Sequence, residues 1–236
     1  MESGEALYDQ ASTIFSPDGR LYQVEYAREA VNKGSTTLGI KFKDGVILIA
    51  HKNLTSNLIK AHTIDKIFQI DDHIGCAFSG LVADAQRLVE IARDEAQVNR
   101  LVYDERIPVK ALVEIICDYM HLYTQFDGIR PFGVALLMAG VDETGNRLFD
   151  TDPSGAFLEY KAICEGTESH SAMAHLNRYY VPNLSLDAAI NLGIQTLRKT
   201  TKKKFNVDSL EIAVMDKKEK FYKMPAKKIS QFMKKE

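Results

Sequence analysis

The sequence has few cysteines and no long hydrophobic run. Its three cysteines, Cys76, Cys117 and Cys164, are widely spaced and form no Cys-x-x-Cys pair. Their odd number and apolar surroundings indicate buried thiols in a reducing compartment. The longest apolar run, Val134–Val141, is far shorter than the roughly 18 residues that a membrane span requires. The first eight residues contain acids and lack the apolar segment of a signal peptide. We therefore expect a cytoplasmic protein with no membrane contact.

Several motifs that mark chemistry are also missing. The six histidines show no zinc-ligand spacing, and no Gly-x-Ser-x-Gly elbow occurs. The segment from Gly34 to Lys41 resembles a phosphate-binding loop. However, its Lys does not directly follow the second Gly, and the segment leads into a predicted strand instead of a helix. We therefore expect no metal and no cofactor.

Charge is nearly balanced overall but uneven along the chain. The net charge is −2, which gives no general bias toward nucleic acid or membranes. Residues 202–236 hold eleven Lys against five acidic residues. One hypothesis is that this tail binds nucleic acid. Because apolar residues alternate with the lysines, we favour a solvated face of a strand and a helix, and we expect no nucleic-acid partner.

The periodicity of apolar residues predicts blocks of hairpins separated by pairs of helices. Helical spacing occurs at 20–31, 83–100, 108–123, 168–180, 185–197 and after Pro225. Strand patterns occur at 35–42, 45–51, 66–71, 74–79, 133–141, 147–150, 156–160, 162–165, 210–215 and 220–223. This order predicts an α+β fold with two antiparallel sheets stacked between helical layers. We divide the chain into a mobile N-terminal arm, residues 1–12, and a single domain, residues 13–236.

One long segment is specific to a known family. The stretch Ile14-Phe-Ser-Pro-Asp-Gly-Arg-Leu-Tyr-Gln-Val-Glu-Tyr-Ala27 resembles the signature of α-type subunits of the proteasome core particle. The likeness continues through Gly34–Ile40, Ser79–Ala85, Arg130–Val134 and Leu148–Gly155, and its pattern is similar to archaeal members. The resemblance implies the αββα four-layer sandwich of N-terminal-nucleophile hydrolases, which agrees with the predicted element order.

This resemblance implies a structural and regulatory function without catalysis of its own. Seven identical α subunits would form the outer ring of the 20S core, a threonine-type endopeptidase complex. The ring would gate the access of unfolded polypeptides, contact β subunits, and dock regulatory ATPases or activators through their C-terminal tails.

The catalytic positions of the related β subunits are only partly matched. Ser35 stands at the position of the N-terminal Thr nucleophile, His51 at that of the acid, and Lys66 at that of the Lys. The nucleophile's free α-amine serves as base in those enzymes, whereas 34 residues precede Ser35 here. We therefore expect no catalytic residue. The alternative is a self-processing N-terminal-nucleophile hydrolase that uses Ser35.

Lys66 is instead expected to anchor a regulator. In α subunits the matching Lys lines a pocket between neighbouring subunits, where its ammonium would pair with a terminal carboxylate. By the same resemblance, Gly19, Leu21, Glu25 and Gly80 lie near that pocket. The alternative is that Lys66 is a solvated side chain on a hairpin.

Two further groups of residues follow from the resemblance. Tyr8, Asp9, Pro17 and Tyr26 match a cluster that holds the N-terminal arm in its open position. Gln10 replaces the Arg that the family usually has in the arm, which weakens any salt bridge that locks the closed gate. Finally, the loop Phe126, Asp127, Gly128 and Ile129 matches the loop that rings the narrow opening of the pore.

Overall fold

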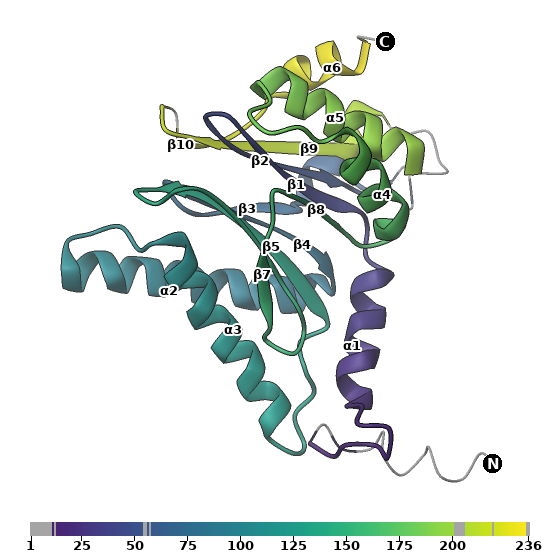
Figure 1. Cartoon of the computed structure of the whole chain (residues 1–236), viewed down its shortest axis with the longest axis vertical. Helices are drawn as coiled ribbons and strands as arrows, with labels where there is room; N and C mark the ends of the chain where they lie inside the picture. The colour runs from purple at the N-terminus through teal and green to yellow at the C-terminus, as the bar shows by residue number, and fades with distance from the viewer. Residues whose placement is uncertain are drawn as a thin grey trace.

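Two five-stranded sheets lie face to face between two layers of helices (Figure 1). The computed structural model describes residues 11, 13–53, 56, 58–200, 206–218 and 220–234. All strand pairs in both sheets are antiparallel. This arrangement is the predicted αββα sandwich.

The first sheet has the strand order β10-β9-β2-β1-β8. Lys43 and Asp44 form the turn of its β1–β2 hairpin, one residue earlier than the predicted Asp44-Gly45 turn, and Phe42 pairs with Gly45 and Thr37 with Ala50. The strands are β1 (Thr37–Phe42), β2 (Gly45–His51), β8 (Ala162–Glu165), β9 (Leu210–Asp216) and β10 (Lys220–Lys223).

The second sheet has the order β3-β4-β5-β6-β7. Its central strand β5 is buried along nearly its whole length, as the continuous apolar run predicts. The strands are β3 (Ile67–Asp71), β4 (Ile74–Gly80), β5 (Val134–Asp142), β6 (Gly145–Thr151) and β7 (Phe157–Glu159).

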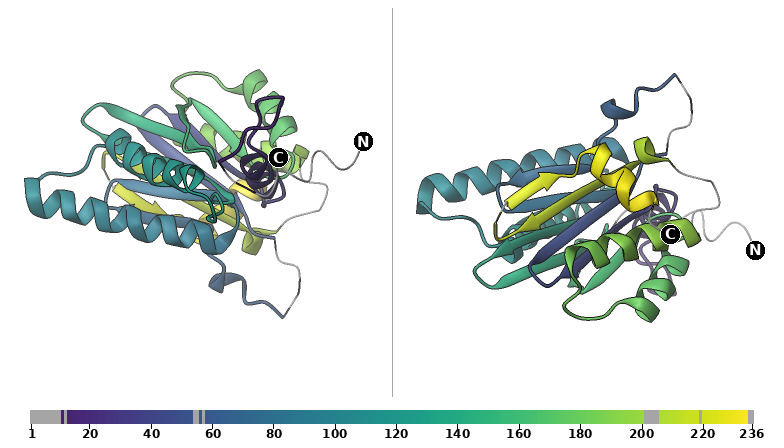
Figure 2. Two further views of the ribbon diagram at one scale, coloured as in Figure 1. Left: turned by 90° about the horizontal axis from the view of Figure 1, so that it is seen from below. Right: turned by 90° about the horizontal axis from the view of Figure 1, so that it is seen from above.

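The helices cover the two outer faces (Figure 2). Apolar residues of α2 (Val82–Tyr103) and α3 (Val109–Gln125) pack on the second sheet. Those of α4 (Ser169–Tyr179), α5 (Leu186–Thr200) and α6 (Ala226–Lys234) pack on the first. A third apolar cluster fills the space between the sheets. These three clusters separate the four layers, because each sheet buries both faces.

Helix α1 (Tyr22–Asn32) packs against β4 and β5. It buries Val24, Ala27 and Val31, which recur at three- and four-residue steps. The chain leaves the helix at Gly34, where a Cβ atom would lie 2.2 Å from Oγ of Ser79 and 2.3 Å from the backbone nitrogen of Gly80. Glycine therefore allows the close passage from α1 into the first sheet.

The predicted helices and strands are confirmed to within a few residues at their ends. Two short 3-10 helices, η2 (Ala61–Thr63) and η3 (Val207–Ser209), were not predicted, because three residues carry no usable periodicity. The three cysteines are buried, as expected. No helix in the described part of the chain is long and apolar enough to cross a membrane.

Candidate functional site

A cavity of about 430 Å³ opens beside the start of β3. Its wall combines apolar side chains with a few polar groups, which is the usual make-up of a ligand pocket. It is lined by Ser35, Asn53, Thr63, Ile64, Asp65, Lys66, Phe68, Phe78, Gly80, Val82 and Gln86. Two of the predicted docking residues, Lys66 and Gly80, thus share one cavity.

The ammonium group of Lys66 is buried and forms no salt bridge with the described residues. Lys66 is 5% exposed, and its Nζ lies 4.1 Å from the centre of the Phe78 ring. Among the described residues, Nζ has no hydrogen-bond or ion-pair partner. The alternative of a solvated hairpin lysine is therefore wrong.

The nearest carboxylate is held by other lysines. Glu211 forms ion pairs with Lys52 at 3.3 Å and with Lys223 at 2.6 Å. It also accepts a hydrogen bond from the backbone N–H of Lys66 at 2.9 Å. Glu211 is a lone acid inside an apolar strand, which is the sequence signal that could have indicated its role.

This environment shifts the pKa of Lys66, which lines the cavity, and of the nearby His51. Burial lowers the pKa of Lys66 to about 8, and the charge of Glu211 offsets only part of that shift. Burial also lowers the pKa of His51, and the charge of Lys66 lowers it further. An anion that enters the cavity would relieve the unpaired charge of Lys66.

Ser35 reaches the same cavity but lacks the environment of an N-terminal nucleophile. The chain continues from α1 through Gly34, whose N–H donates to the carbonyl of Val31 at 2.9 Å. The nitrogen of Ser35 is therefore a peptide nitrogen and cannot act as the amine base. His51, at the position of the catalytic acid, is half-buried at the end of β2.

The other predicted docking residues lie at the far end of α1. Leu21 precedes the first residue of the helix, and Glu25 is in its first turn. Gly19 lies in the preceding turn with φ +75°. Eleven helical residues separate the two ends by about 16 Å. One subunit therefore does not bring Gly19, Leu21 and Glu25 to Lys66, and their role in a pocket between subunits stays a prediction.

Of the predicted gate residues, Pro17 and Tyr26 are described, whereas Tyr8, Asp9 and Gln10 lie outside the described residues. Pro17 lies in a turn that Ser16 closes. The carbonyl of Ser16 accepts a hydrogen bond from the N–H of Gly19 at 2.8 Å, and Oγ of Ser16 accepts one from the N–H of Arg20 at 3.0 Å. Tyr26 is half-exposed on α1 and stacks on Tyr22, with ring centres 6.3 Å apart.

The predicted pore loop links α3 to β5. Phe126 and Ile129 are exposed apolar side chains. Gly128 has φ +77°, and its N–H donates to the carboxylate of Asp127 at 3.0 Å. Figure 1 shows this loop and the segment before α1 at the same end of the molecule. The segment just before α1 and the pore loop thus share one end.

A salt bridge that the sequence did not indicate fastens α1 to the second sheet. The guanidinium of Arg28 donates to both carboxylate oxygens of Asp152, at 2.8 and 3.0 Å. Asp150 and Glu165 line the adjacent cavity. Burial raises the pKa of Asp150 and raises that of Glu165 to about 7. Arg28 and Asp152 are more than a hundred positions apart, so no local sequence pattern could reveal their salt bridge.

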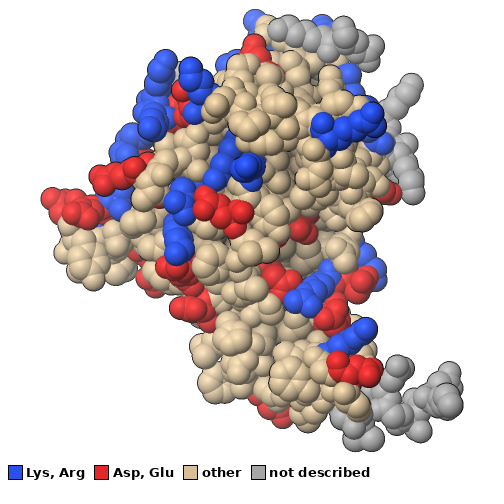
Figure 3. Space-filling model, viewed as in Figure 1, with Lys and Arg blue, Asp and Glu red and all other residues tan. Residues whose placement is uncertain are grey.

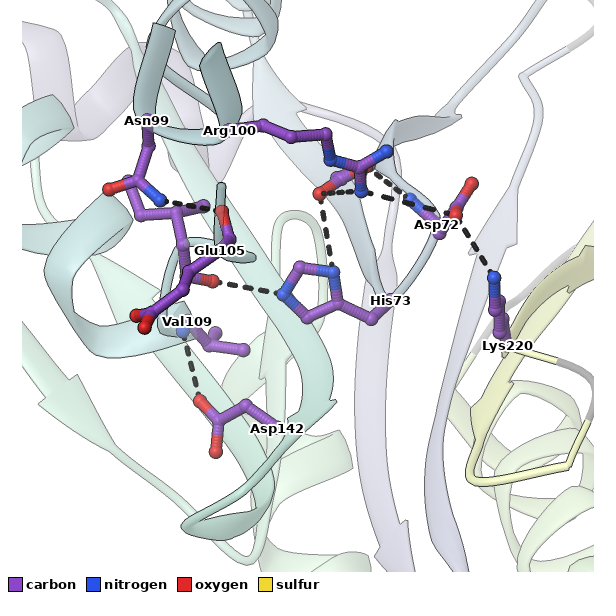
Figure 4. Close-up of polar contacts among 10 residues, drawn as sticks. Asp72, His73, Asn99, Arg100, Glu105, Val109, Asp142 and Lys220 are labelled. Carbon is purple, nitrogen blue, oxygen red and sulfur yellow. Dashed lines mark hydrogen bonds and ion pairs between the residues drawn. The ribbon is translucent and has the colours of Figure 1, made fainter. Parts of the chain in front are cut away.

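A larger cavity, about 650 Å³, lies elsewhere, among the hairpin turns and the α2–α3 connection. Nearby, Arg100 donates to both carboxylate oxygens of buried Asp71 (Figure 4). Nε2 of buried His73 lies 2.9 Å from the carbonyl of Ile107. The same figure shows Lys220 paired with Asp72 at 3.0 Å. These contacts hold the end of α2 in place.

Surface charges do not separate by sign. On the face shown in Figure 3, Lys and Arg side chains lie beside Asp and Glu side chains. In the C-terminal region, Lys220 pairs with Asp72, and Lys223 pairs with Asp65 and Glu211. Ion pairs thus account for Lys220 and Lys223, and the absence of a nucleic-acid partner stays a prediction.

The four-layer αββα sandwich places the chain in the N-terminal-nucleophile hydrolase-like class. Comparison with known families narrows this class. Residues 31–215 match the family described as "Proteasome subunit", and residues 8–30 match the N-terminal signature of the A-type members of that family. The chain belongs to the proteasome subunit family and is of the archaeal α type.

Relatives named as the alpha subunit of the proteasome match nearly the whole chain. That of Methanosarcina mazei is 53% identical and covers 92% of this chain and 87% of its own length. Those of Methanosarcina thermophila and Methanopyrus kandleri are 51% and 50% identical, covering 96% and 98% of this chain and 92% and 94% of their own. The chain is therefore an outer-ring structural subunit of the 20S core and a non-catalytic component of it, which assembles with other proteasome subunits.

Proposed function

We propose that the cavity around Lys66 docks the C-terminal tail of a regulatory ATPase or activator. The observation that carries this proposal is the buried ammonium of Lys66, which has no ion-pair partner among the described residues. A terminal carboxylate would supply the missing charge-assisted hydrogen bond. The apolar wall formed by Ile64, Phe68 and Val82 suits an apolar side chain next to that carboxylate.

The proposal includes gating at the other end of α1. Seven α subunits form a ring in the cytoplasm, and their N-terminal residues control the access of unfolded polypeptides. The turn around Pro17 and the loop 126–129 are placed at one end of the molecule, which supports a common role there. Residues Gly19, Leu21 and Glu25 of one subunit complete the Lys66 pocket of its neighbour.

The end of α2 is proposed to contact a β subunit. Leu101, Val102 and Tyr103 are largely exposed apolar side chains in its last turn, and exposed apolar clusters mark protein interfaces. The ion pair between Arg100 and Asp71 holds this turn to the second sheet. A fixed apolar surface loses little conformational entropy on binding.

The docking proposal is tested by stimulation of peptide hydrolysis in an assembled α–β particle. Lys66→Ala removes the cation, and a buried carboxylate left unpaired costs roughly 2–5 kcal/mol. We therefore expect stimulation by regulator tails to be lost while basal hydrolysis persists. Lys66→Arg keeps the charge but changes its shape, and should rescue only partly.

Lys60→Ala is the matched control, because Lys60 is exposed in the segment that precedes β3. It should leave stimulation unchanged, since an exposed charge contributes about 0–1 kcal/mol. Full stimulation of the Lys66→Ala particle would show that the cavity does not dock tails.

A further inference from the structure

The amine of Lys66 has the surroundings of a reactive nucleophile. Its side chain is 5% exposed, lies over the Phe78 ring, and borders a cavity of about 430 Å³. Because Lys66 forms no salt bridge with the described residues, its ammonium can lose a proton without the loss of an ion pair. Desolvated lysines of this kind are the nucleophilic lysines of proteins.

We propose that Lys66 is a site of covalent acylation by small anionic acyl phosphates. The protonated amine attracts the phosphate group, and the cavity is large enough for a molecule of this size. Thr63, Asn53 and Gln86 offer neutral polar groups in the same wall. The acylation of Lys66 does not depend on tail docking. Only the effect of this modification on tail binding rests on the proposed docking function.

The reaction balances without a further reactant. After the ammonium of Lys66 loses a proton to water, the lone pair of Nζ attacks the carbonyl carbon of the acyl phosphate. The bond between that carbon and the phosphate oxygen breaks, and inorganic phosphate leaves with the electron pair. The nitrogen loses a second proton to water, and the product is a neutral amide.

Burial favours a neutral Lys66 amine near pH 8, against the effect of the neighbouring charge of Glu211. Among the described residues, Glu211 is the only carboxylate whose charge raises the pKa of Lys66. Burial outweighs this effect and lowers that pKa to about 8. Glu211 is shared with two other lysines, and Asp65 pairs with Lys223. Within one subunit, the groups that face this region from the loops and from β2, β9 and β10 are Asp65, Lys52, His51, Glu211 and Lys223. In the ring proposed above, Glu25 of the neighbouring subunit, which is paired with Arg28, joins them.

The neutral fraction at pH 7.5 then differs strongly between Lys66 and an ordinary lysine. It is about one quarter for a pKa near 8 and about 0.001 for a pKa near 10.5. An amine of lower basicity is also a weaker nucleophile, as is a thiolate of lower basicity. This effect reduces the rate advantage that Lys66 gains from its larger neutral fraction by roughly tenfold. We expect Lys66 to react about tenfold faster than an exposed lysine.

The test uses acetyl phosphate on the full-length assembled ring, with acetylation of each lysine followed by peptide mass spectrometry from pH 7 to 10. Lys60 serves as the internal control, because it is exposed in the same segment. The rate at Lys66 should exceed that at Lys60 about tenfold at pH 7.5 and level off above about pH 8.5, whereas the rate at Lys60 keeps rising.

Slower acetylation of Lys66 than of Lys60 at pH 7.5, or a rate at Lys66 that still rises tenfold from pH 9 to 10, would overturn the proposal. The measurement needs no regulator. A failed docking experiment therefore does not affect the acylation proposal, and a failed acetylation experiment does not affect the docking proposal. If docking operates as proposed, the acetylated ring should bind regulator tails at least tenfold more weakly.

Discussion

Replacing Lys66 with methionine should stabilise the free subunit while removing its docking function. The side chain is 5% exposed and its ammonium has no ion-pair partner among the described residues. Burial lowers its pKa from 10.5 to about 8. At about 1.4 kcal/mol per pKa unit, the buried charge costs the folded state roughly 3 kcal/mol. Met fills a similar volume without a charge, but loses the contact between Nζ and the Phe78 ring, which is worth about 1 kcal/mol.

The expected net gain for Lys66→Met is therefore roughly 2 kcal/mol at pH 7. For a domain of this size, such a gain raises Tm by about 4–8 °C. In the unfolded chain the amine keeps a pKa near 10.5, so at pH 7 it is charged in both states and only the folded state carries the penalty. As pH rises through about 8, the folded protein loses this proton first, and the penalty disappears by about pH 10.5. The advantage of Met should shrink over that window.

Thermal unfolding of the two proteins at several pH values measures this difference. Lys60→Met is the control, because an exposed position should change stability by no more than about 0.5 kcal/mol. A Lys66→Met protein that is less stable than the wild type at pH 7 would contradict the proposed cost of the buried Lys66 charge. So would an advantage that stays constant up to pH 10.5.

Three further predictions concern other parts of the molecule. Deletion of residues 2–12 should raise peptide hydrolysis by an assembled α–β particle without preventing assembly; an unchanged rate would remove the gate assignment from this segment. Gly34→Ala should destabilise the subunit by about 3 kcal/mol, because its Cβ would lie 2.2 Å from Oγ of Ser79 and 2.3 Å from the nitrogen of Gly80; a wild-type Tm would contradict this. Leu101→Ser, on an 84% exposed side chain, should keep the Tm within about 2 °C but weaken co-assembly with β subunits in native electrophoresis; unchanged co-assembly would place the contact elsewhere.

Much of the fold could be predicted because its signals are local. The spacing of Val24, Ala27 and Val31 defines α1, and the Asp44-Gly45 pair marks the first hairpin turn. The assignment of hairpins to two sheets does not follow from such patterns. The β1–β2 and β3–β4 hairpins lie in different sheets, and only tertiary packing decides this.

The site was predictable only where the family signature reaches it. Lys66 was singled out by resemblance, but its backbone N–H donates to Glu211, which is 145 positions away. Likewise, the pairing of Arg28 with Asp152 joins residues 124 positions apart. Long-range pairs of this kind leave no trace in the spacing of one sequence. For the same reason, the sequence did not show that Gly19, Leu21 and Glu25 are remote from Lys66 within one subunit.

The most direct test of the account compares two forms of one regulator tail peptide, with a free and with an amidated C-terminus. Their affinities are measured at pH 7 for assembled rings of the wild type and of Lys66→Ala. Amidation should weaken binding to the wild-type ring at least tenfold, which is about 1.4 kcal/mol or more, and should have little effect on the variant ring. Equal affinities of both peptides for the wild-type ring would contradict the proposal that Lys66 binds the terminal carboxylate.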